Sequence, residues 1–371
     1  MKNFNFHRAY AIARKEVMHI LRDPFTLTLA LGLPVMLVTF FGYAIDFEVK
    51  NVKLAVLDRD KGPAARRLEE IFSSSGYFTL APAGSESPVE MIDSGRASAA
   101  IFIEPGFSKK IKGGGQAGAQ FLLDGSDNSK AAAVMGYLPG IERAAARRLA
   151  GQEAREPVSL ETRFLYNPEL NSRWFTVPGL AAIIIGLLAI LLTALTVARE
   201  WENGSMELLL STPVRPLEIM AGKLAPYGIL VLAGVFFVYL VARFIFGVPF
   251  NGSHLLYLAA CLLFILAALS QGLVISVITR QQQVAMQFGM ITGLLPSLLL
   301  SGFIFPVESM PRFFQYFTMI LPPRWFMAAA RGIALKGAGL EELAVPFLAL
   351  GLLSAIMLGL ALLKFKTDLE P

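Results

Sequence analysis

Six long apolar segments constrain this chain more than any other feature of its sequence. Each holds about 20 predominantly apolar residues, the length that an α-helix needs to cross the hydrocarbon core of a membrane. They occupy 26–45, 177–198, 227–246, 254–278, 284–304 and 343–363, and Arg243 is the one Asp, Glu, Lys or Arg within them. We therefore expect an α-helical integral membrane protein with six transmembrane helices.

The charged residues are concentrated between the first two of these segments. Asp, Glu, Lys and Arg make up 16% of the chain, against about 25% in soluble domains, and 33 of the 61 lie within 47–176. A polar domain set into a membrane protein is the expected organisation. One cysteine, Cys261, and three scattered histidines argue against disulfides and metal sites. Membrane topology accounts for the net charge of +5 better than nucleic-acid binding does.

Lys and Arg in the short connections predict the orientation, because long polar domains cross the membrane regardless of their charge. One side carries eleven of these residues, and the other carries five: Arg243, Arg312, Arg324, Arg331 and Lys336. Both termini are therefore predicted to be cytoplasmic. The expected parts are a cytoplasmic interfacial helix (1–25), a first transmembrane helix (26–46), an extracytoplasmic α/β domain (47–176), a five-helix transmembrane region (177–363) and a cytoplasmic tail (364–371).

The first 22 residues have the pattern of an amphipathic helix that ends at Asp23-Pro24. Such a helix lies in the headgroup plane, with its basic residues on anionic lipid. A soluble terminal helix is the alternative. One stripe holds Phe6, Tyr10, Ala13, Val17 and Leu21, and another holds Arg8, Lys15 and Arg22.

The polar domain alternates short apolar runs with helical patterns. Strands are predicted at 52–58, 97–103, 119–124 and 158–166, helices at 64–74 and about 128–151, and loops at 81–88 and 111–118. This alternation is typical of a small α/β domain with a mixed or parallel sheet. Asp58 and Asp60 lack a nearby histidine or a second acidic pair, so we expect binding or gating here and no catalytic residue.

The sequence contains no obvious source of energy for transport. No acidic residue lies inside a predicted span, which argues against proton coupling. The Gly222-Lys223-Leu224 stretch lacks the upstream glycine and the hydroxyl of a phosphate-binding loop. We therefore expect a chain that is not itself an enzyme and holds no cofactor, with ATP and Mg bound by a separate ATPase subunit.

The longest predicted cytoplasmic connection, 199–226, contains a short helix between helix-breaking residues. Gly204 interrupts the second span, Ser205 can cap a new helix, and Glu207 favours its first turn. Pro213 ends this helix, and Pro216 suits the first position of the next one. The expected result is a helix at about 203–213, parallel to the membrane. An ordinary interfacial turn is the alternative.

The same stretch resembles the type 2 exporter permeases of ATP-binding-cassette (ABC) transporters, most closely the bacterial multidrug-efflux-like branch with a large extracytoplasmic domain. In that family it forms the coupling helix that docks on the ATPase. Trp201 and Ser205 depart from the commoner residues without removing the chemistry. The resemblance carries over to Arg199, Glu200, Glu202, Gly204, Ser205, Met206, Glu207, Leu209, Thr212 and Pro213.

Three further passages are similar to the same branch: 13–24, 163–179 and 301–337. The last belongs to a proline-interrupted, aromatic segment at about 305–340, predicted to be a re-entrant hairpin at the outer interface. It could seal a transport path or only anchor the chain.

The leading hypothesis is the permease subunit of an ABC exporter in the bacterial inner membrane. It would carry a hydrophobic or amphipathic substrate out of the cytoplasm or inner leaflet. The expected partners are cytoplasmic ABC ATPase subunits, a second identical or related permease chain, membrane lipid and, as a further candidate, a periplasmic adaptor. The candidate path residues are Phe288, Met290, Phe303 and Phe305. The alternative is a membrane-anchored receptor or assembly scaffold with an extracytoplasmic ligand-binding domain.

Overall fold

A computed structural model describes residues 4–44, 51–82, 87–125, 128–149 and 171–365 of the chain. The chain divides into two compact units. One comprises Met1–Asp46 and Phe164–Pro371, and the other comprises Phe47–Arg163. The predicted strand at 158–166 lies outside the described residues.

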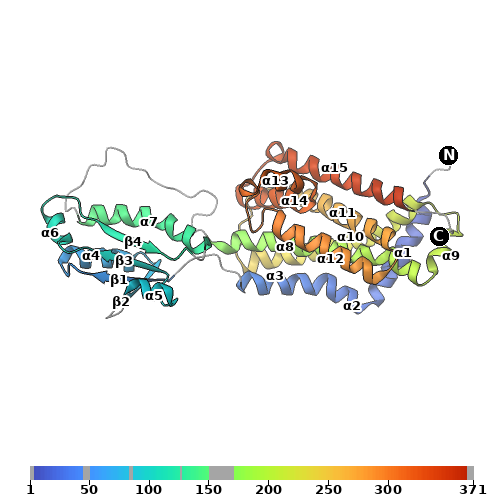
Figure 1. The fold of residues 1–371 in the computed structure, drawn as a ribbon. Coiled ribbons are helices and arrows are strands. Elements are labelled where there is room, and N and C mark those ends of the chain that lie inside the picture. Colours follow the sequence, from blue (N-terminus) through green and yellow to red (C-terminus); the bar gives the residue numbers. More distant parts are fainter. Residues whose placement is uncertain (1–3, 45–50, 83–86, 126–127, 150–170, 366–371) are drawn as a thin grey trace. The chain divides into compact units, whose positions relative to one another are not determined.

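The first unit is a bundle of helices (Figure 1). Six of its described helices are long and apolar enough to cross a membrane, which confirms the predicted number. They run over Pro24–Ala44, Ser172–Glu202, Pro216–Ile245, His254–Thr279, Gln282–Leu300 and Leu340–Lys364. By element these are α2 (Pro24–Leu27) with η1 (Thr28–Gly32) and α3 (Leu33–Ala44), then α8 (Ser172–Glu202), α10 (Pro216–Leu240) with η2 (Val241–Ile245), α11 (His254–Thr279), α12 (Gln282–Leu300) and α15 (Leu340–Lys364).

The centre of the bundle is α8, most of whose side chains are buried. It packs against α3, α10, α11, α12 and α14 (Pro322–Arg331). The side of α12 that faces it carries small residues at every fourth position, so the two backbones can approach closely. These residues are Ala285, Gly289, Gly293 and Ser297.

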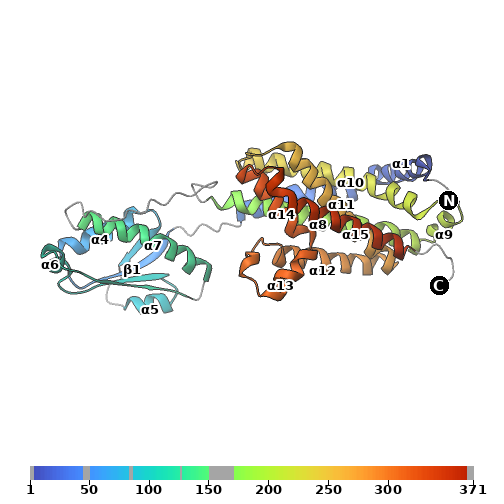
Figure 2. The same cartoon turned by 90° about the horizontal axis from the view of Figure 1, so that it is seen from above.

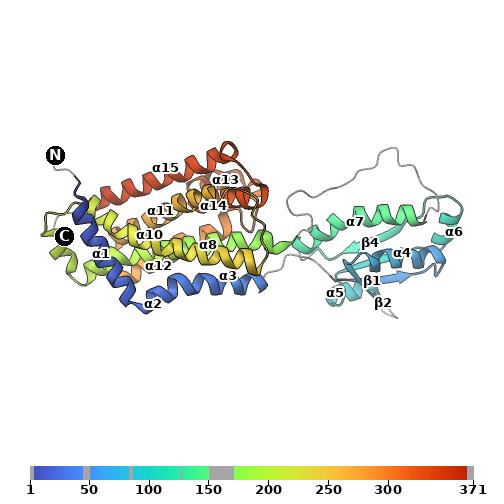
Figure 3. The same cartoon turned by 180° about the vertical axis from the view of Figure 1, so that it is seen from behind.

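Short helices mark the two ends of the bundle (Figure 1). At one end, α1 (Phe6–Arg22) lies across the bundle at an angle to the long helices, near α9 (Ser205–Leu210) (Figure 3). The opposite end carries η3 (Val307–Ser309), α13 (Arg312–Phe317), η4 (Thr318–Ile320), α14 and η5 (Gly332–Lys336). The predicted re-entrant hairpin is thus a chain of short helical segments.

The second unit is an α/β fold with a mixed sheet of strand order β2-β1-β3-β4. The strands are β1 (Val52–Asp58), β2 (Phe78–Pro82), β3 (Ala99–Ile103) and β4 (Ala119–Leu123). Both β2 and β3 are parallel to β1, with Leu54 opposite Leu80 and Ala99, whereas β4 is antiparallel to β3. The expected α/β sheet is therefore present, in its mixed form.

Two hydrophobic cores lie on the two faces of this sheet. The larger contains residues of α4 (Pro63–Ser74), α6 (Phe107–Lys112) and α7 (Asn128–Leu149), and the smaller contains residues of α5 (Pro88–Asp93) (Figure 2). The sequence prediction missed β2, α5 and α6. It assigned Ala81 and Pro82 to a loop, whereas their backbones pair with Ala55 and Val56 of β1. A five-residue strand that ends in proline has too little periodicity to be recognised alone.

Candidate functional site

The predicted short helix after the second span is α9, a six-residue helix at Ser205–Leu210. Gly204, with φ +69°, occupies the left-handed region that ends α8 and allows the chain to turn. The sequence predicts that Ser205 caps α9, but it does not. It is the first helical residue, and its hydroxyl donates to the carbonyl of Glu200 at 3.3 Å. The cap position belongs to Gly204, because the left-handed turn is needed there.

The side chains of α9 face in opposite directions. Met206 is fully buried, and Leu209 packs against the core of the bundle. Glu207 is exposed, and 73% of the Leu208 side chain is accessible. After the helix, the Thr212 hydroxyl donates to the carbonyl of Leu209 at 2.6 Å, and Arg8 of α1 donates to the carbonyl of Pro213. Thus α9 is anchored on one side and presents an acid and a leucine on the other.

An ion network with a buried centre lies behind α9 and joins α1, α8 and α10. Nζ of Lys223 lies 2.8 Å from Oε1 of Glu16 and 2.9 Å from Oε2 of Glu200. Lys15 reaches the other oxygen of Glu200 at 2.7 Å, and the Tyr227 hydroxyl donates to Glu16 at 3.3 Å. We call Glu16, Glu200, Lys15, Lys223 and Tyr227 the ion network. It fixes α1 to the ends of two spans.

Lys15 lies at the edge of this network. Burial opposes its charge, but the hydrogen bond to Glu200 and the negative charges of Glu200 and Glu16 outweigh that effect and raise the pKa of Lys15. The ammonium therefore stays charged over the whole physiological range.

The start of α1 is held to the start of α10 by Glu218, which is fully buried. Its carboxylate accepts from the backbone N–H of Asn5 at 2.8 Å and of Arg215 at 3.0 Å, and Arg8 lies at 3.9 Å. A charged acceptor bonded to two backbone donors is a strong link. Two separate carboxylates on α8 and α10 thus hold α1 in place.

The end of α8 is also tied to α12. Arg199 donates through Nε to Gln282 at 3.3 Å and through Nη1 to Nε2 of His19 at 2.8 Å. The Gln282 amide donates to Glu202, and the guanidinium of Arg280 stacks on Trp201 at 4.4 Å. The family-matched residues Arg199, Glu200 and Glu202 therefore contact the bundle, whereas Glu207 and Leu208 face outward.

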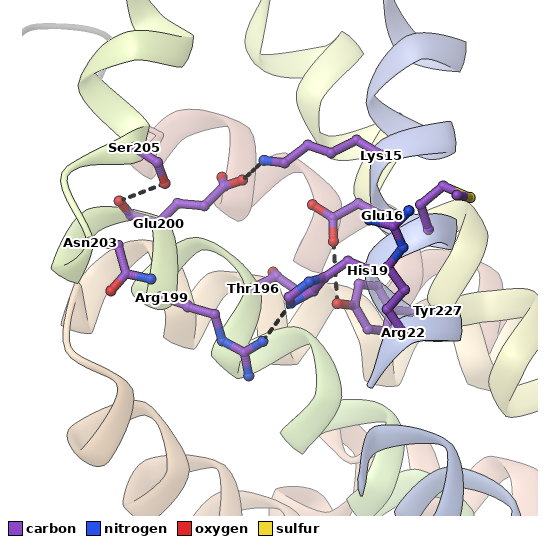
Figure 4. A pocket seen from close by; sticks show the side chains of 11 residues that line it. Lys15, Glu16, His19, Arg22, Thr196, Arg199, Glu200, Asn203, Ser205 and Tyr227 are labelled. Carbon is purple, nitrogen blue, oxygen red and sulfur yellow. Dashed lines mark hydrogen bonds and ion pairs between the residues drawn. The ribbon is translucent and has the colours of Figure 1, made fainter. Parts of the chain in front are cut away.

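A cavity of 390 Å³ lies between α1 and the end of α8 (Figure 4). Its floor contains Glu16, Glu200 and Tyr227 of the ion network, and Thr196 lies beside them. Basic side chains from both helices point toward it (Figure 4). The lining residues are Lys15, Glu16, Met18, His19, Arg22, Thr196, Arg199, Glu200, Asn203, Ser205 and Tyr227.

The sequence analysis missed Glu16, Lys223 and Tyr227. The predicted apolar stripe of α1 is its exposed side: Phe6, Tyr10, Val17 and Leu21 are exposed, and Ala13 is half-buried. A second face, which the sequence pattern did not reveal, packs on the bundle and holds Ala9, Ile12, Glu16 and Ile20. Two features of the sequence point to this contact between α1 and α10. Glu16 lies at helical spacing from Ile12 and Ile20, and a glycine, Gly222, directly precedes Lys223.

Gly222 is the position where α1 crosses α10. A Cβ atom there would lie 2.7 Å from Cβ of Ile12 and 2.8 Å from the carbonyl oxygen of Ala9. Only glycine permits this approach, and the approach brings Lys223 within reach of Glu16. Gly222-Lys223 thus serves helix packing and ion pairing.

The four candidate path residues lie in two environments. Phe288 and Met290 of α12 and Phe305 beyond it are about half exposed. Phe303 is only 3% exposed, stacks on Phe175 with ring centroids 6.3 Å apart, and fills the space over Gly179. Phe303 therefore belongs to the packing of the bundle end.

The hairpin segment is held by two arginines. Arg331 donates to the carbonyl of Gly302 at 3.1 Å and lies 3.7 Å over the Phe175 ring. Arg324 donates to the carbonyl of Gln315 at 2.6 Å and to the Thr318 hydroxyl. Phe313, Phe314, Tyr316 and Phe317 of α13 remain exposed. An apolar surface on a positioned hairpin fits a membrane interface.

Neither unit shows a centre for metal chemistry among its described residues, where His, Cys, Asp and Glu form no group of three that could hold an ion.

Asp60 of the second unit joins two segments of the α/β fold through hydrogen bonds. Its carboxylate accepts from the backbone N–H groups of Gly106 and Ser108 at 2.9 and 3.1 Å, and also from the Ser108 hydroxyl.

Comparison with known proteins connects this arrangement to transport. Residues 24–363 match the family model described as "ABC-2 family transporter protein". The probable multidrug ABC transporter permease YbhS of Escherichia coli K12 is 33% identical over 371 residues, covering 99% of this chain and 98% of the relative. YbhR of the same strain, also named a probable multidrug ABC transporter permease, is 33% identical over 91% of this chain and 92% of its own. The inner membrane transport permease YhhJ is 32% identical over 95% of both chains.

Proposed function

Because this chain belongs to the ABC-2 family of transporter proteins, we propose that it is the permease subunit of an ATP-driven exporter. The cargo would be a hydrophobic or amphipathic molecule taken from the cytoplasm or the inner leaflet. The names of the bacterial relatives and the six apolar helices support a transport permease over a receptor or scaffold.

We place the chain in a bacterial inner membrane with both termini in the cytoplasm and the α/β unit outside. The excess of Lys and Arg in the connections at the α1 end supports this orientation. Partner ATPase subunits, which bind ATP and Mg, would then meet the bundle at α9. A second permease chain, identical or related, would complete the pathway, and a periplasmic adaptor is a candidate partner of the outer unit.

The observation that carries the proposal is the two-sided character of α9. Its buried side, through Met206 and Leu209, transmits any displacement to the bundle. Its outward side offers Leu208 as an apolar anchor and Glu207 as a charge, the combination typical of small docking interfaces. Movement of the ATPases would therefore reach α8 and α10, and through the ion network also α1.

Phe288, Met290 and Phe305 are our candidates for the substrate path, because they leave large apolar side chains exposed along α12 and just beyond its end. Phe303 would act from behind them, by fixing the hairpin against Gly179. The role of the hairpin would be to close the outer end of the path.

The test is ATP hydrolysis and substrate export by the reconstituted complex of this chain and its ATPase. Glu207→Lys and Leu208→Ala should abolish the stimulation of hydrolysis and weaken recovery of the ATPase with the permease. Leu255→Ala is the matched control, because Leu255 is 75% exposed, like Leu208, but lies at the start of α11. Full stimulation and export by both α9 variants would refute the coupling assignment.

A further inference from the structure

The cavity between α1 and α8 contains more cationic groups than its own acids require. Glu16 and Glu200 are already bonded within the ion network to Lys223, Lys15 and Tyr227. Arg22 has no hydrogen bond or ion pair to any described residue, and Nη2 of Arg199 likewise has no such partner. The guanidinium of Arg22 and the Nη2 group of Arg199, two residues that line one cavity, can therefore donate to an anion.

The surroundings of the cavity indicate where that anion would come from. The outer face of α1 exposes apolar side chains: Phe6, Tyr10, Val17, Met18 and Leu21. Phe25, 73% exposed, follows Arg22 at the point where the chain turns into the first apolar span at Pro24. An amphipathic helix with this face lies at the boundary between headgroups and acyl chains. Arg22 thus lies at the level of lipid phosphates.

We propose that this cavity binds the phosphate of an anionic phospholipid headgroup. The guanidinium groups of Arg22 and Arg199 donate to the phosphate oxygens from α1 and α8, and the acyl chains run along the exposed face of α1. Arginine suits this role, since its planar donors match phosphate oxygens. A cavity of 390 Å³ has room for a glycerophosphate headgroup. Basic pockets beside membrane helices on the cytoplasmic side recognise such lipids.

The binding would join two helices that support α9. The phosphate bridges Arg22 of α1 and Arg199 of α8 across the cavity that Asn203 and Ser205 also line. Lipid would therefore stabilise the geometry in which α1 is packed on the bundle.

The experiment uses the full chain, purified in detergent and stripped of lipid. Native mass spectrometry and thermal unfolding are measured with added phosphatidylglycerol, phosphatidylcholine or inorganic phosphate alone. We expect phosphatidylglycerol to bind and to raise the unfolding midpoint, with much weaker effects of the other two. Arg22→Gln should weaken this binding about tenfold, the factor expected for a charge-assisted hydrogen bond.

Arg14→Gln is the matched control, because Arg14 lies exposed on the same helix and does not line the cavity. It removes the same charge and should leave binding unchanged. Arg22→Gln should also fold normally, since Arg22 has no bond to a described residue. Arg22→Gln with Arg199→Gln should abolish the selectivity for phosphatidylglycerol.

Three results would overturn the proposal. Equal losses in the Arg14 and Arg22 variants would show a diffuse surface charge effect. An equal response to inorganic phosphate would identify a site for a free anion and not for a lipid. Finally, displacement of the bound lipid by the ATPase, together with weaker ATPase binding by Arg22→Gln, would show that the cavity belongs to the interface with the ATPase.

Discussion

Lys223 of α10 holds its ammonium 2.8 Å from the carboxylate of Glu16 on α1, and both side chains are buried. The same ammonium lies 2.9 Å from Glu200 of α8, so one cation joins three helices. Such a buried ion network contributes position more than net stability, because removing Lys223 leaves the Glu16 carboxylate buried without its cation. The position it determines is that of α1 on the bundle.

Removal of this cation should be strongly destabilising. Lys223→Met leaves Glu16 and Glu200 buried side by side, and we expect the free energy of unfolding to fall by about 3–5 kcal/mol. Thermal or denaturant unfolding of the purified chain measures this. Lys336→Met, a control at an exposed lysine of η5, should have little effect. Adding Glu16→Gln to Lys223→Met should cost less than the sum of the single changes, and strict additivity would argue against a coupled pair.

The close approach of α1 to α10 at Gly222 predicts a steric effect. Gly222→Ala places a methyl group 2.7 Å from Ile12 and 2.8 Å from the carbonyl oxygen of Ala9, so α1 must shift. We expect a loss of about 1–3 kcal/mol and weaker coupling to ATP hydrolysis. Gly228→Ala on the same helix is the control, since its Cβ would meet only Leu269 at 3.5 Å. Equal stability of the two variants would contradict the close packing of α1.

At the opposite end, Gly179 should be equally restrictive. A Cβ atom there would lie 2.3 Å from the Phe303 ring and 3.3 Å from Nη2 of Arg331. Gly179→Ala should overpack this contact, lower the free energy of unfolding by about 1–3 kcal/mol and so lower the unfolding midpoint. Adding Phe303→Leu should restore part of the loss. Gly351→Ala of α15, where no atom lies within 4 Å, serves as the control. Failure of Phe303→Leu to compensate would place the strain elsewhere.

Asp60 predicts a pH dependence in the α/β unit. The hydrogen bonds from the Ser108 hydroxyl and from the backbone of Ser108 and Gly106 lower the pKa of Asp60 below its ordinary value of 3.8. Its contribution to stability is therefore full above about pH 4 and is lost as the pH falls through the lower folded-state value. Asp60→Asn should be less stable than the natural chain at pH 7, and the difference should vanish in acid.

Thermal unfolding between about pH 3 and pH 7 measures this difference. Asp93→Asn is the control, because Asp93 is exposed at the end of α5 and has no hydrogen bond to a described residue. A difference between Asp60→Asn and the natural chain that stays constant over this range would show that the carboxylate charge is not responsible.

The six spans, the presence of an α/β unit and the short helix after Gly204 could be predicted from local sequence. Apolar length, alternation and helix-breaking residues act over neighbouring positions and need no distant contact. The same reasoning could not show that Arg199, Glu200 and Glu202 face the bundle while Glu207 and Leu208 face outward. Their orientation depends on α1 and α12, whose sequence positions are far away.

The sequence by itself thus determined that the chain spans a membrane, because burial of about 20 apolar residues in one helix is a property of that segment alone. It also determined where the helices break, through Gly204, Pro213 and Pro216. Only the tertiary structure decided the partners of the charged residues at that end. Glu16 and Lys223 meet across 207 positions of sequence, and a contact at that separation exists only after the helices have packed.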